Sequence, residues 1–174
     1  MKLSDMLQVV EVLASTAPAD REITGVAYDS RRVKPGDAFV AISGFATDGN
    51  RYIPKAVERG AGLIVTERVP DTPAPYVQVA SARLALAQMG ANWFGRPAER
   101  MTMVGVTGTN GKTSVTLLLK SVLEQVTGSA VGLIGTIQNM IGPEILPTER
   151  TTPESFDLQE LLARMASAGC RYVV

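Results

Sequence analysis

The sequence predicts an α/β protein in which a small N-terminal α/β domain precedes a second domain built on a parallel sheet. Three observations support this fold class. The chain has 174 residues, 45% hydrophobic and 20% charged, which suits a globular protein with a real core. Short β-rich runs alternate with segments of helical spacing along the whole chain. "GRPAER", residues 95–100, then combines Gly, Pro and charge in one short stretch, so we place a boundary there, between domains 1–97 and 98–174.

The first domain is expected to begin with a short helix, because Leu3, Met6, Leu7 and Val10 share one helical face. Strands are then predicted in "ITGVAYDSR" and "GDAFVAI", followed by a helix, a Gly turn and a buried strand over residues 51–67 and a further strand in "YVQVA". A helix over residues 81–95 is expected to be capped by Ser81. Its predicted inward positions are Leu84, Ala87, Ala91 and Phe94.

The second domain is expected to begin as a strand over residues 101–107, followed by a glycine-rich loop and a helix. The apolar positions that predict this helix are Val115, Leu118, Leu119, Val122 and Val126. "SAVGLIGT" predicts a strand, residues 137–150 a long Pro-containing loop, and "RYVV" the start of another strand. A helix within residues 151–169 should turn Leu158, Leu161, Leu162 and Met165 inward. Parallel crossovers of this kind place ligands at the carboxyl ends of strands.

Composition excludes several functions for this stretch of sequence. Seventeen Lys and Arg balance seventeen Asp and Glu, so we expect no nucleic-acid partner and no attraction to an anionic membrane. The absence of histidine excludes Ser-His and Cys-His nucleophiles and His-ligated zinc, and the single cysteine excludes an internal disulfide. No apolar run has the length of a signal peptide core or a membrane span, so we expect a cytoplasmic protein without membrane insertion.

The glycine-rich loop "GVTGTNGKTSV", residues 105–115, predicts a phosphate site. Gly108 and Gly111 allow a tight bend, and the backbone from Gly108 through Thr109, Asn110 and Gly111 to Ser114 would cradle a nucleotide. Lys112 would reach the β- and γ-phosphates of ATP, and Thr113 would hold Mg2+. The alternative is a glycine-rich turn without a ligand. The loop also departs from the usual pattern, because Val106 stands where that pattern has its first Gly.

"GTNGKTS" resembles the phosphate loop of the Mur ligases, ATP-dependent enzymes of peptidoglycan synthesis, and folylpolyglutamate synthetases share a similar loop. Residues 29–61, "DSRRVKPGDAFVAISGFATDGNRYIPKAVERGA", resemble the UDP-sugar-binding domain of the branches that add the third residue and the terminal dipeptide. "GTIQNMIG" and "ERTTPES" resemble the tripeptide-forming branch, which joins an amino acid, meso-diaminopimelate or L-lysine, to UDP-N-acetylmuramoyl-L-alanyl-D-glutamate. The dipeptide-adding branch stays an alternative.

The resemblance implies roles for individual residues. Ser30 would contact the nucleotide end of the UDP-sugar, with Phe45, Ala46 and Thr47 near the uridine. Simple turns at Asp29–Ser30 and at residues 44–49 are the alternatives. Thr151 and Thr152 would hold the sugar-peptide, although Thr152 also suits a helix N-cap with Pro153 in the first helical position. Asn110 could brace the loop or touch substrate, and Arg150 stands where some relatives have Asn.

Lys112 would act in catalysis by neutralising charge on the phosphoryl group as an acyl phosphate forms on the substrate. The resemblance further implies a monomeric full enzyme, in which an absent C-terminal domain binds the amino acid. The second domain is shorter than a full ATPase domain, so we expect this chain to be the N-terminal part of a ligase and inactive alone. A non-catalytic module that binds UDP-sugar and ATP, and an unrelated phosphate-loop kinase or GTPase, are the rival functions.

Overall fold

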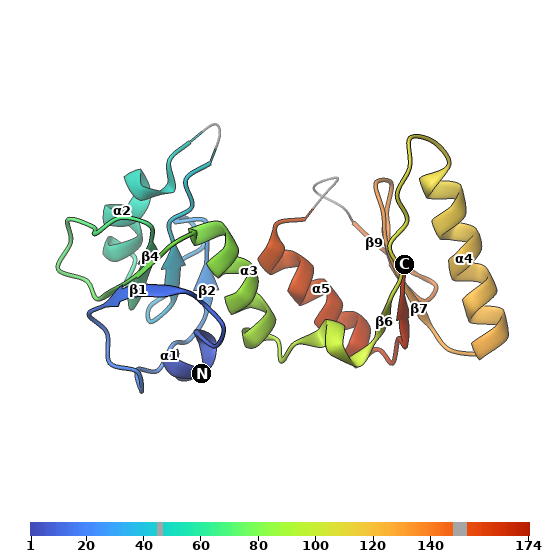
Figure 1. Ribbon diagram of the computed structural model, residues 1–174, viewed down its shortest axis with the longest axis horizontal. Coiled ribbons are helices and arrows are strands. Elements are labelled where there is room, and N and C mark those ends of the chain that lie inside the picture. Colours follow the sequence, from blue (N-terminus) through green and yellow to red (C-terminus); the bar gives the residue numbers. More distant parts are fainter. Residues whose placement is uncertain (45–46, 148–152) are drawn as a thin grey trace. The chain divides into compact units, whose positions relative to one another are not determined.

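A computed structural model describes residues 1–44, 47–147 and 153–174. The chain forms two compact units, Met1–Trp93 and Phe94–Val174 (Figure 1). This division lies four residues before the boundary that the sequence analysis placed after residue 97. Both units combine helices with a sheet, which confirms the α/β class. Across the described ranges, each helix is too short or too polar to cross a bilayer.

The sheet of the first unit runs in the order β1-β5-β4-β3-β2. Its strands are β1 (Val12–Ser15), β2 (Val26–Ala27), β3 (Ala38–Val40), β4 (Leu63–Thr66) and β5 (Tyr76–Val79). Strands β2 to β5 pair in parallel, and β1 pairs antiparallel with β5. The sequence does not predict β1, because its residues, VLAS, lack the alternation of apolar and polar side chains that marks a strand, and the structure leaves all four exposed.

The helices of this unit are α1 (Leu3–Met6), the 3-10 helix η1 (Gly49–Tyr52), α2 (Ile53–Glu58) and α3 (Ala82–Trp93). The predicted cap of α3 is confirmed, because Ser81 Oγ accepts from Leu84 N at 3.3 Å. Its predicted inward face is wrong. Leu84 is 55% exposed, whereas Ala85, Leu86 and Met89 are buried. Positions i and i+3 fit several faces of a helix this rich in alanine, so spacing alone did not select the buried one.

The sheet of the second unit runs in the order β6-β10-β7-β8-β9. Its strands are β6 (Thr102–Met103), β7 (Val131–Ile134), β8 (Asn139–Ile141), β9 (Glu144–Leu146) and β10 (Tyr172–Val173). Strands β6, β10 and β7 are parallel, whereas β7, β8 and β9 pair antiparallel. Residues 137–147, the described part of the predicted loop 137–150, therefore do not form a plain loop. A hairpin forms there because Gly142, at φ 54°, and Pro143 make a tight connection.

The helices of the second unit are the 3-10 helix η2 (Pro97–Arg100), α4 (Lys112–Thr127) and α5 (Ser155–Ser167), with α4 and α5 on opposite sides of the sheet (Figure 1). Helix α5 buries Leu161, Leu162 and Met165, as predicted. It begins two residues after Pro153, with Glu154 as its cap, so Pro153 is not its first residue.

Helix α4 forms as predicted but presents most of its apolar stripe to solvent. It packs on the core around Val131 and Leu133 through Leu119 and Leu123. Exposed apolar side chains on the helix are Val115, Leu117, Leu118, Val122 and Val126.

Candidate functional site

The predicted phosphate loop connects β6 to α4 in the second unit. Its two central glycines adopt positive φ angles, 149° at Gly108 and 77° at Gly111, where a side chain would be strained. Gly111 is the N-cap of α4, and its carbonyl accepts from Val115 N at 2.9 Å. The loop is exposed, and it leads directly into the positive end of a 16-residue helix.

Lys112, the first residue of α4, is folded back over this loop. Its Nζ donates to the carbonyl of Gly108 at 2.6 Å and lies 3.5 Å from that of Thr109. The amine is exposed. A cation is thus held beside the bend of the loop, where it can exchange a carbonyl partner for a phosphate oxygen. Asn110 and Ser114 are also exposed, and Thr113 is half-buried at the start of the helix.

A cavity of about 190 Å³ lies between the start of α4 and the segment that follows β7. The parallel pairing of β6, β10 and β7 puts the carboxyl ends of β6 and β7 at one edge of the sheet, so the two loops meet there. The cavity is lined by Val106, Lys112, Thr113, Thr116, Leu117, Leu133, Ile134, Gly135, Thr136, Ile137 and Gln138. Thr136 and Gln138 are not among the site residues that the sequence predicted. Both follow the strand "VGLI", and a position just after a parallel strand could have indicated a site there.

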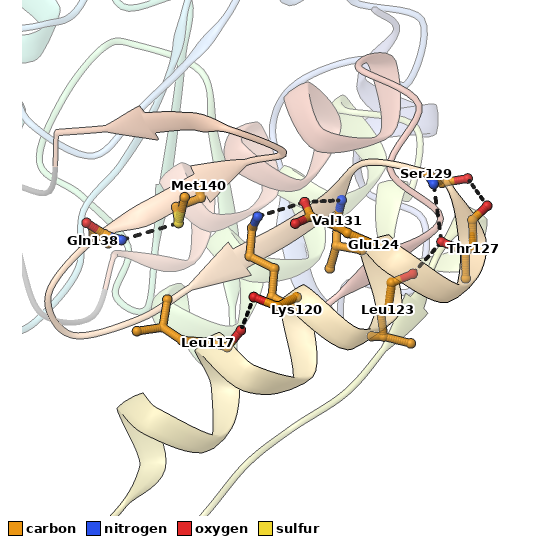
Figure 2. Close-up of polar contacts among 10 residues, drawn as sticks. Leu117, Lys120, Leu123, Glu124, Thr127, Ser129, Val131, Gln138 and Met140 are labelled. Atoms are coloured by element: carbon orange, nitrogen blue, oxygen red, sulfur yellow. Dashed lines mark hydrogen bonds and ion pairs between the residues drawn. The ribbon is translucent and has the colours of Figure 1, made fainter.

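The segment that closes this cavity is held by its own side chains. Asn139 is buried, and its Oδ1 accepts from Gly135 N at 3.3 Å. Gln138 Nε2 donates to Met140 Sδ at 3.2 Å, and Figure 2 shows Gln138 and Leu117 on the two facing elements. The buried Asn139 thereby fixes the backbone of the turn, while Gln138 engages only a weak acceptor.

A partly buried ion pair, with a buried lysine and a half-buried glutamate, lies where α4 packs against β7. Lys120 is 5% exposed, and its Nζ lies 2.7 Å from Glu124 Oε1 (Figure 2). The same carboxylate oxygen accepts from the backbone N–H of Val131 at 3.4 Å. Pairing offsets the cost of burying the lysine charge, and the bond to Val131 links the helix to the strand. The cavity wall at Leu117 is therefore supported by contacts one turn further along the helix.

The residues present suit Mg2+ bound through a nucleotide. Among the described residues there is no group of three His, Cys, Asp or Glu side chains that could hold a metal ion. Mg2+ commonly takes few protein ligands and completes its shell with phosphate oxygens and waters, so the hydroxyl of Thr113 fits such a role. Cys170 is buried, and burial raises the pKa of its thiol, which does not favour a thiolate nucleophile.

In the first unit, Ser30 and Thr47 follow the carboxyl ends of the adjacent parallel strands β2 and β3. Ser30 is buried, with 6% of its surface exposed. Asp29 beside it accepts from Arg31 N at 2.9 Å, and Arg31 Nη2 lies 2.6 Å from Asp29 Oδ2. The side-chain hydrogen bond from Arg31 lowers the pKa of Asp29 to about 2. This geometry agrees with a turn at Asp29–Ser30 and leaves the predicted ligand role a prediction.

The loop that contains Thr47 is braced on both sides. Gly44 N donates to the Thr47 carbonyl at 3.0 Å, and Asp48 Oδ1 accepts from Asn50 N at 3.0 Å and from Asn50 Nδ2 at 2.6 Å. Hydrogen bonds from Asn50 hold the pKa of Asp48 below its ordinary value. Thr47 itself is exposed.

Four predicted site residues, Phe45, Ala46, Thr151 and Thr152, lie outside the described residues, as does Arg150. The structure brings Lys112 and Thr113 together at one cavity, and it places Ser30 and Thr47 at one sheet edge in the other unit.

Two family models match the chain. The one described as "Mur ligase family, catalytic domain" matches residues 22–94, and the one described as "Mur ligase middle domain" matches residues 106–174. A UDP-N-acetylmuramoyl-L-alanyl-D-glutamate–2,6-diaminopimelate ligase of Caldanaerobacter subterraneus subsp. tengcongensis is 48% identical over 176 residues, covering 100% of this chain and 36% of that protein. The ligase of the same name from Bacteroides fragilis is 44% identical, covering 99% and 36%. A UDP-N-acetylmuramyl-tripeptide synthetase of Roseiflexus sp. is 45% identical, covering 100% and 35%.

Solved structures agree at the level of fold. A structure of a UDP-N-acetylmuramoyl-L-alanyl-D-glutamate–2,6-diaminopimelate ligase matches with a TM-score of 0.78 at 22% identity, over 99% of this chain and 35% of that one. The MurF ligase of Thermotoga maritima, solved in complex with ADP, matches with a TM-score of 0.55 at 24% identity, over 86% and 30%. The chain thus spans about a third of the length of the curated relatives it matches.

Proposed function

Because this chain belongs to the Mur ligase family, we propose that it is the part of an ATP-dependent carboxylate–amine ligase that binds a UDP-sugar and the phosphates of ATP. The proposed reaction adds the third amino acid, diaminopimelate or L-lysine, to UDP-N-acetylmuramoyl-L-alanyl-D-glutamate during peptidoglycan synthesis. Diaminopimelate is the amino acid in the names of the ligases from Caldanaerobacter and Bacteroides. We place the whole enzyme in the cytoplasm, as a monomer.

One observation carries the ATP side of this proposal. A loop at the carboxyl end of a parallel strand bends through two positive-φ glycines into the N-terminus of α4, with an exposed lysine as the first helical residue. Backbone N–H groups, the positive end of a helix and a lysine side chain therefore lie close together. Together they can bind the oxygens of a polyphosphate. Gly108–Gly111 and Ser114 would cradle the phosphates, and Thr113 would ligate Mg2+.

The chemistry needs no protein nucleophile. A carboxylate oxygen of the acceptor attacks the γ-phosphorus of ATP and ADP leaves; the amine nitrogen of the amino acid then attacks the acyl carbon, releasing phosphate and a proton. Lys112 would neutralise charge on the transferred phosphoryl group. The hydrogen bond from its Nζ to the Gly108 carbonyl, which keeps the ammonium next to the loop, supports this role. Mg2+, held by the hydroxyl of Thr113 and by phosphate oxygens, would supply further positive charge to the transferred phosphoryl group.

The UDP-sugar side rests on the first unit. We propose that Ser30 and the loop of Phe45, Ala46 and Thr47 contact the nucleotide end, and that Thr151 and Thr152 contact the sugar-peptide. Support comes from the sheet, because Ser30 and Thr47 follow neighbouring parallel strands at their carboxyl ends, the edge where such sheets bind ligands.

The test is nucleotide binding by the 174-residue chain. Calorimetric titration with ATP and Mg2+ is expected to show binding, and Lys112→Ala is expected to weaken it about 10- to 150-fold, the loss of one charge-assisted hydrogen bond. Lys55→Ala is the matched control, because Lys55 is an exposed lysine of the first unit, on α2. A wild-type chain that binds no ATP, or a Lys112→Ala chain that binds as well as the control, would refute the assignment of the loop.

A further inference from the structure

Residues 42–44 and 47–49 form the two limbs of a narrow ribbon that follows β3 in the first unit. Backbone contacts join the limbs, Ile42 with Gly49, Ser43 with Asp48, and Gly44 with Thr47. The limbs run side by side beyond the sheet (Figure 1). A two-stranded ribbon of this kind is at best marginally stable in water, so its placement depends on contacts with the rest of the unit.

The side chain of Asn50 supplies such contacts. Its Oδ1 accepts from Thr66 Oγ1 at 2.8 Å, and Thr66 is fully buried at the end of β4. Its Nδ2 donates to Asp48 Oδ1 at 2.6 Å and to Ser43 Oγ at 3.4 Å. One carboxamide therefore joins a strand of the sheet to both limbs of the ribbon.

This arrangement needs an acceptor and a donor on the same short side chain. The carboxamide of Asn50 provides both, because its oxygen accepts and its nitrogen donates. Asn50→Asp would keep the acceptor for Thr66, but it would place a second carboxylate against that of Asp48, and two carboxylates in such contact repel each other. The chemical identity of residue 50 therefore decides whether the ribbon is held against the sheet.

We propose that Asn50 is a positioning residue for the UDP-sugar, because it holds Thr47 at the sheet edge where Ser30 also lies. The inference rests on the proposed function, in which Thr47 contacts the nucleotide end. Without the contacts of Asn50, the ribbon would have to be ordered when the ligand binds, and that loss of conformational freedom weakens binding. A ribbon that is fixed in advance avoids this loss.

The test measures calorimetrically how the 174-residue chain binds UDP-N-acetylmuramoyl-L-alanyl-D-glutamate and, separately, ATP with Mg2+. Asn50→Ala and Asn50→Asp are expected to weaken binding of the UDP-sugar peptide about three- to tenfold and to leave ATP affinity unchanged. The double variant Asp48→Asn with Asn50→Asp exchanges donor and acceptor, and it is expected to restore the affinity. Gln8→Glu changes an exposed amide of the same unit and is the control for the added charge.

A second measurement reports on the ribbon itself. The amide of Gly44 donates to the Thr47 carbonyl at 3.0 Å, and this bond slows exchange of the amide hydrogen, which NMR can follow. Asn50→Ala is expected to lose this protection and the double variant to keep it, while the amides of β4 stay protected in every folded variant.

The outcomes separate the two proposals. Unchanged binding of the UDP-sugar peptide by folded Asn50→Ala would overturn the inference and leave the proposed function intact. Weaker binding with an unchanged Gly44 exchange rate would also overturn it, because Asn50 would then act by direct contact. The same conclusion follows if the double variant binds as weakly as Asn50→Asp, or if ATP affinity falls equally, which would indicate a general effect on the chain. A wild-type chain that binds ATP but not the UDP-sugar peptide would overturn the proposed UDP-sugar site itself.

Discussion

At the scale of single residues, the ion pair between Asp29 and Arg31 makes the stability of the turn beside Ser30 depend on pH. The pKa of Asp29 is lowered from 3.8 to about 2, chiefly by the side-chain hydrogen bond from Arg31. A carboxyl whose pKa is lower in the folded state stabilises the fold above its unfolded pKa, and this contribution is lost as the pH falls through the folded value. The contribution is therefore complete above about pH 4 and disappears toward pH 2.

We predict that Arg31→Gln raises the pKa of Asp29 toward 3.8, because the ionic donor is lost. The measurement is an NMR titration of the Asp29 carboxyl carbon. Denaturant melts of both proteins should show a stability difference above about pH 4 that closes toward pH 2, with Arg21→Gln, on the same unit, as the control. A difference that stays constant from pH 5 to pH 2 would mean that the pair does not stabilise the turn.

Residue-level predictions from sequence succeeded where the backbone imposed a rule. Gly108 and Gly111 were selected because a tight bend needs residues that tolerate positive φ, and both adopt it. No comparable backbone requirement identifies Gln138 as a site residue. That it lines the same cavity as Lys112 depends on β7 ending at the same sheet edge as β6, which is a property of strand order. The ligand roles of Ser30 and Thr47 stay predictions.

At the scale of elements, α3 offers two leucines in opposite environments. Leu86 is fully buried and Leu84 is 55% exposed. We predict that Leu86→Ala lowers the free energy of unfolding by about 2–5 kcal/mol, through lost burial and the cavity left behind. Leu84→Ala should change it by no more than about 0.5 kcal/mol, as is usual for exposed positions. Urea denaturation of both variants checks this. Equal losses would contradict the different burial of Leu84 and Leu86 in the structure.

The elements that spacing predicted well are those with one dominant pattern. Helix α5 has apolar residues three or four positions apart and polar residues between them, so the burial of Leu161, Leu162 and Met165 was predicted correctly. The hairpin of β8 and β9 was missed because Gly142 and Pro143 also mark loops, and three-residue strands are too short to show a period. Helix α4 shows a further limit. Most of its strongest stripe, from Val115 to Val126, is exposed, and only Leu119 of that stripe packs on the core, so periodicity identified the helix but not the side that packs.

At the scale of the whole molecule, the proposed function divides between two units that each have a core. The first unit packs Phe39, Ile53 and Ile64 together, and the second packs Leu162, Met165 and Val173. The sequence predicted two α/β domains from alternating elements and a Gly-Pro stretch. The arrangement of the two units is not something a pattern along the chain could supply, because it depends on surfaces distant in sequence.

We predict that residues 1–97 fold on their own. Their sheet is complete within the unit, and Asn92 Nδ2 donates to the carbonyls of Met6 at 3.0 Å and Gln8 at 2.7 Å, which ties the end of α3 to the N-terminal segment. A fragment of this size, holding its own core, should unfold cooperatively in urea. Its amide NMR signals should superimpose on those of the 174-residue chain, except near the cut.

We also predict that this fragment binds UDP-N-acetylmuramoyl-L-alanyl-D-glutamate weakly. Ser30→Ala should reduce that binding, and Ser4→Ala is the control. A fragment with collapsed signal dispersion would mean that the first unit needs the second to fold, and a folded fragment without affinity would remove the UDP-sugar site from it.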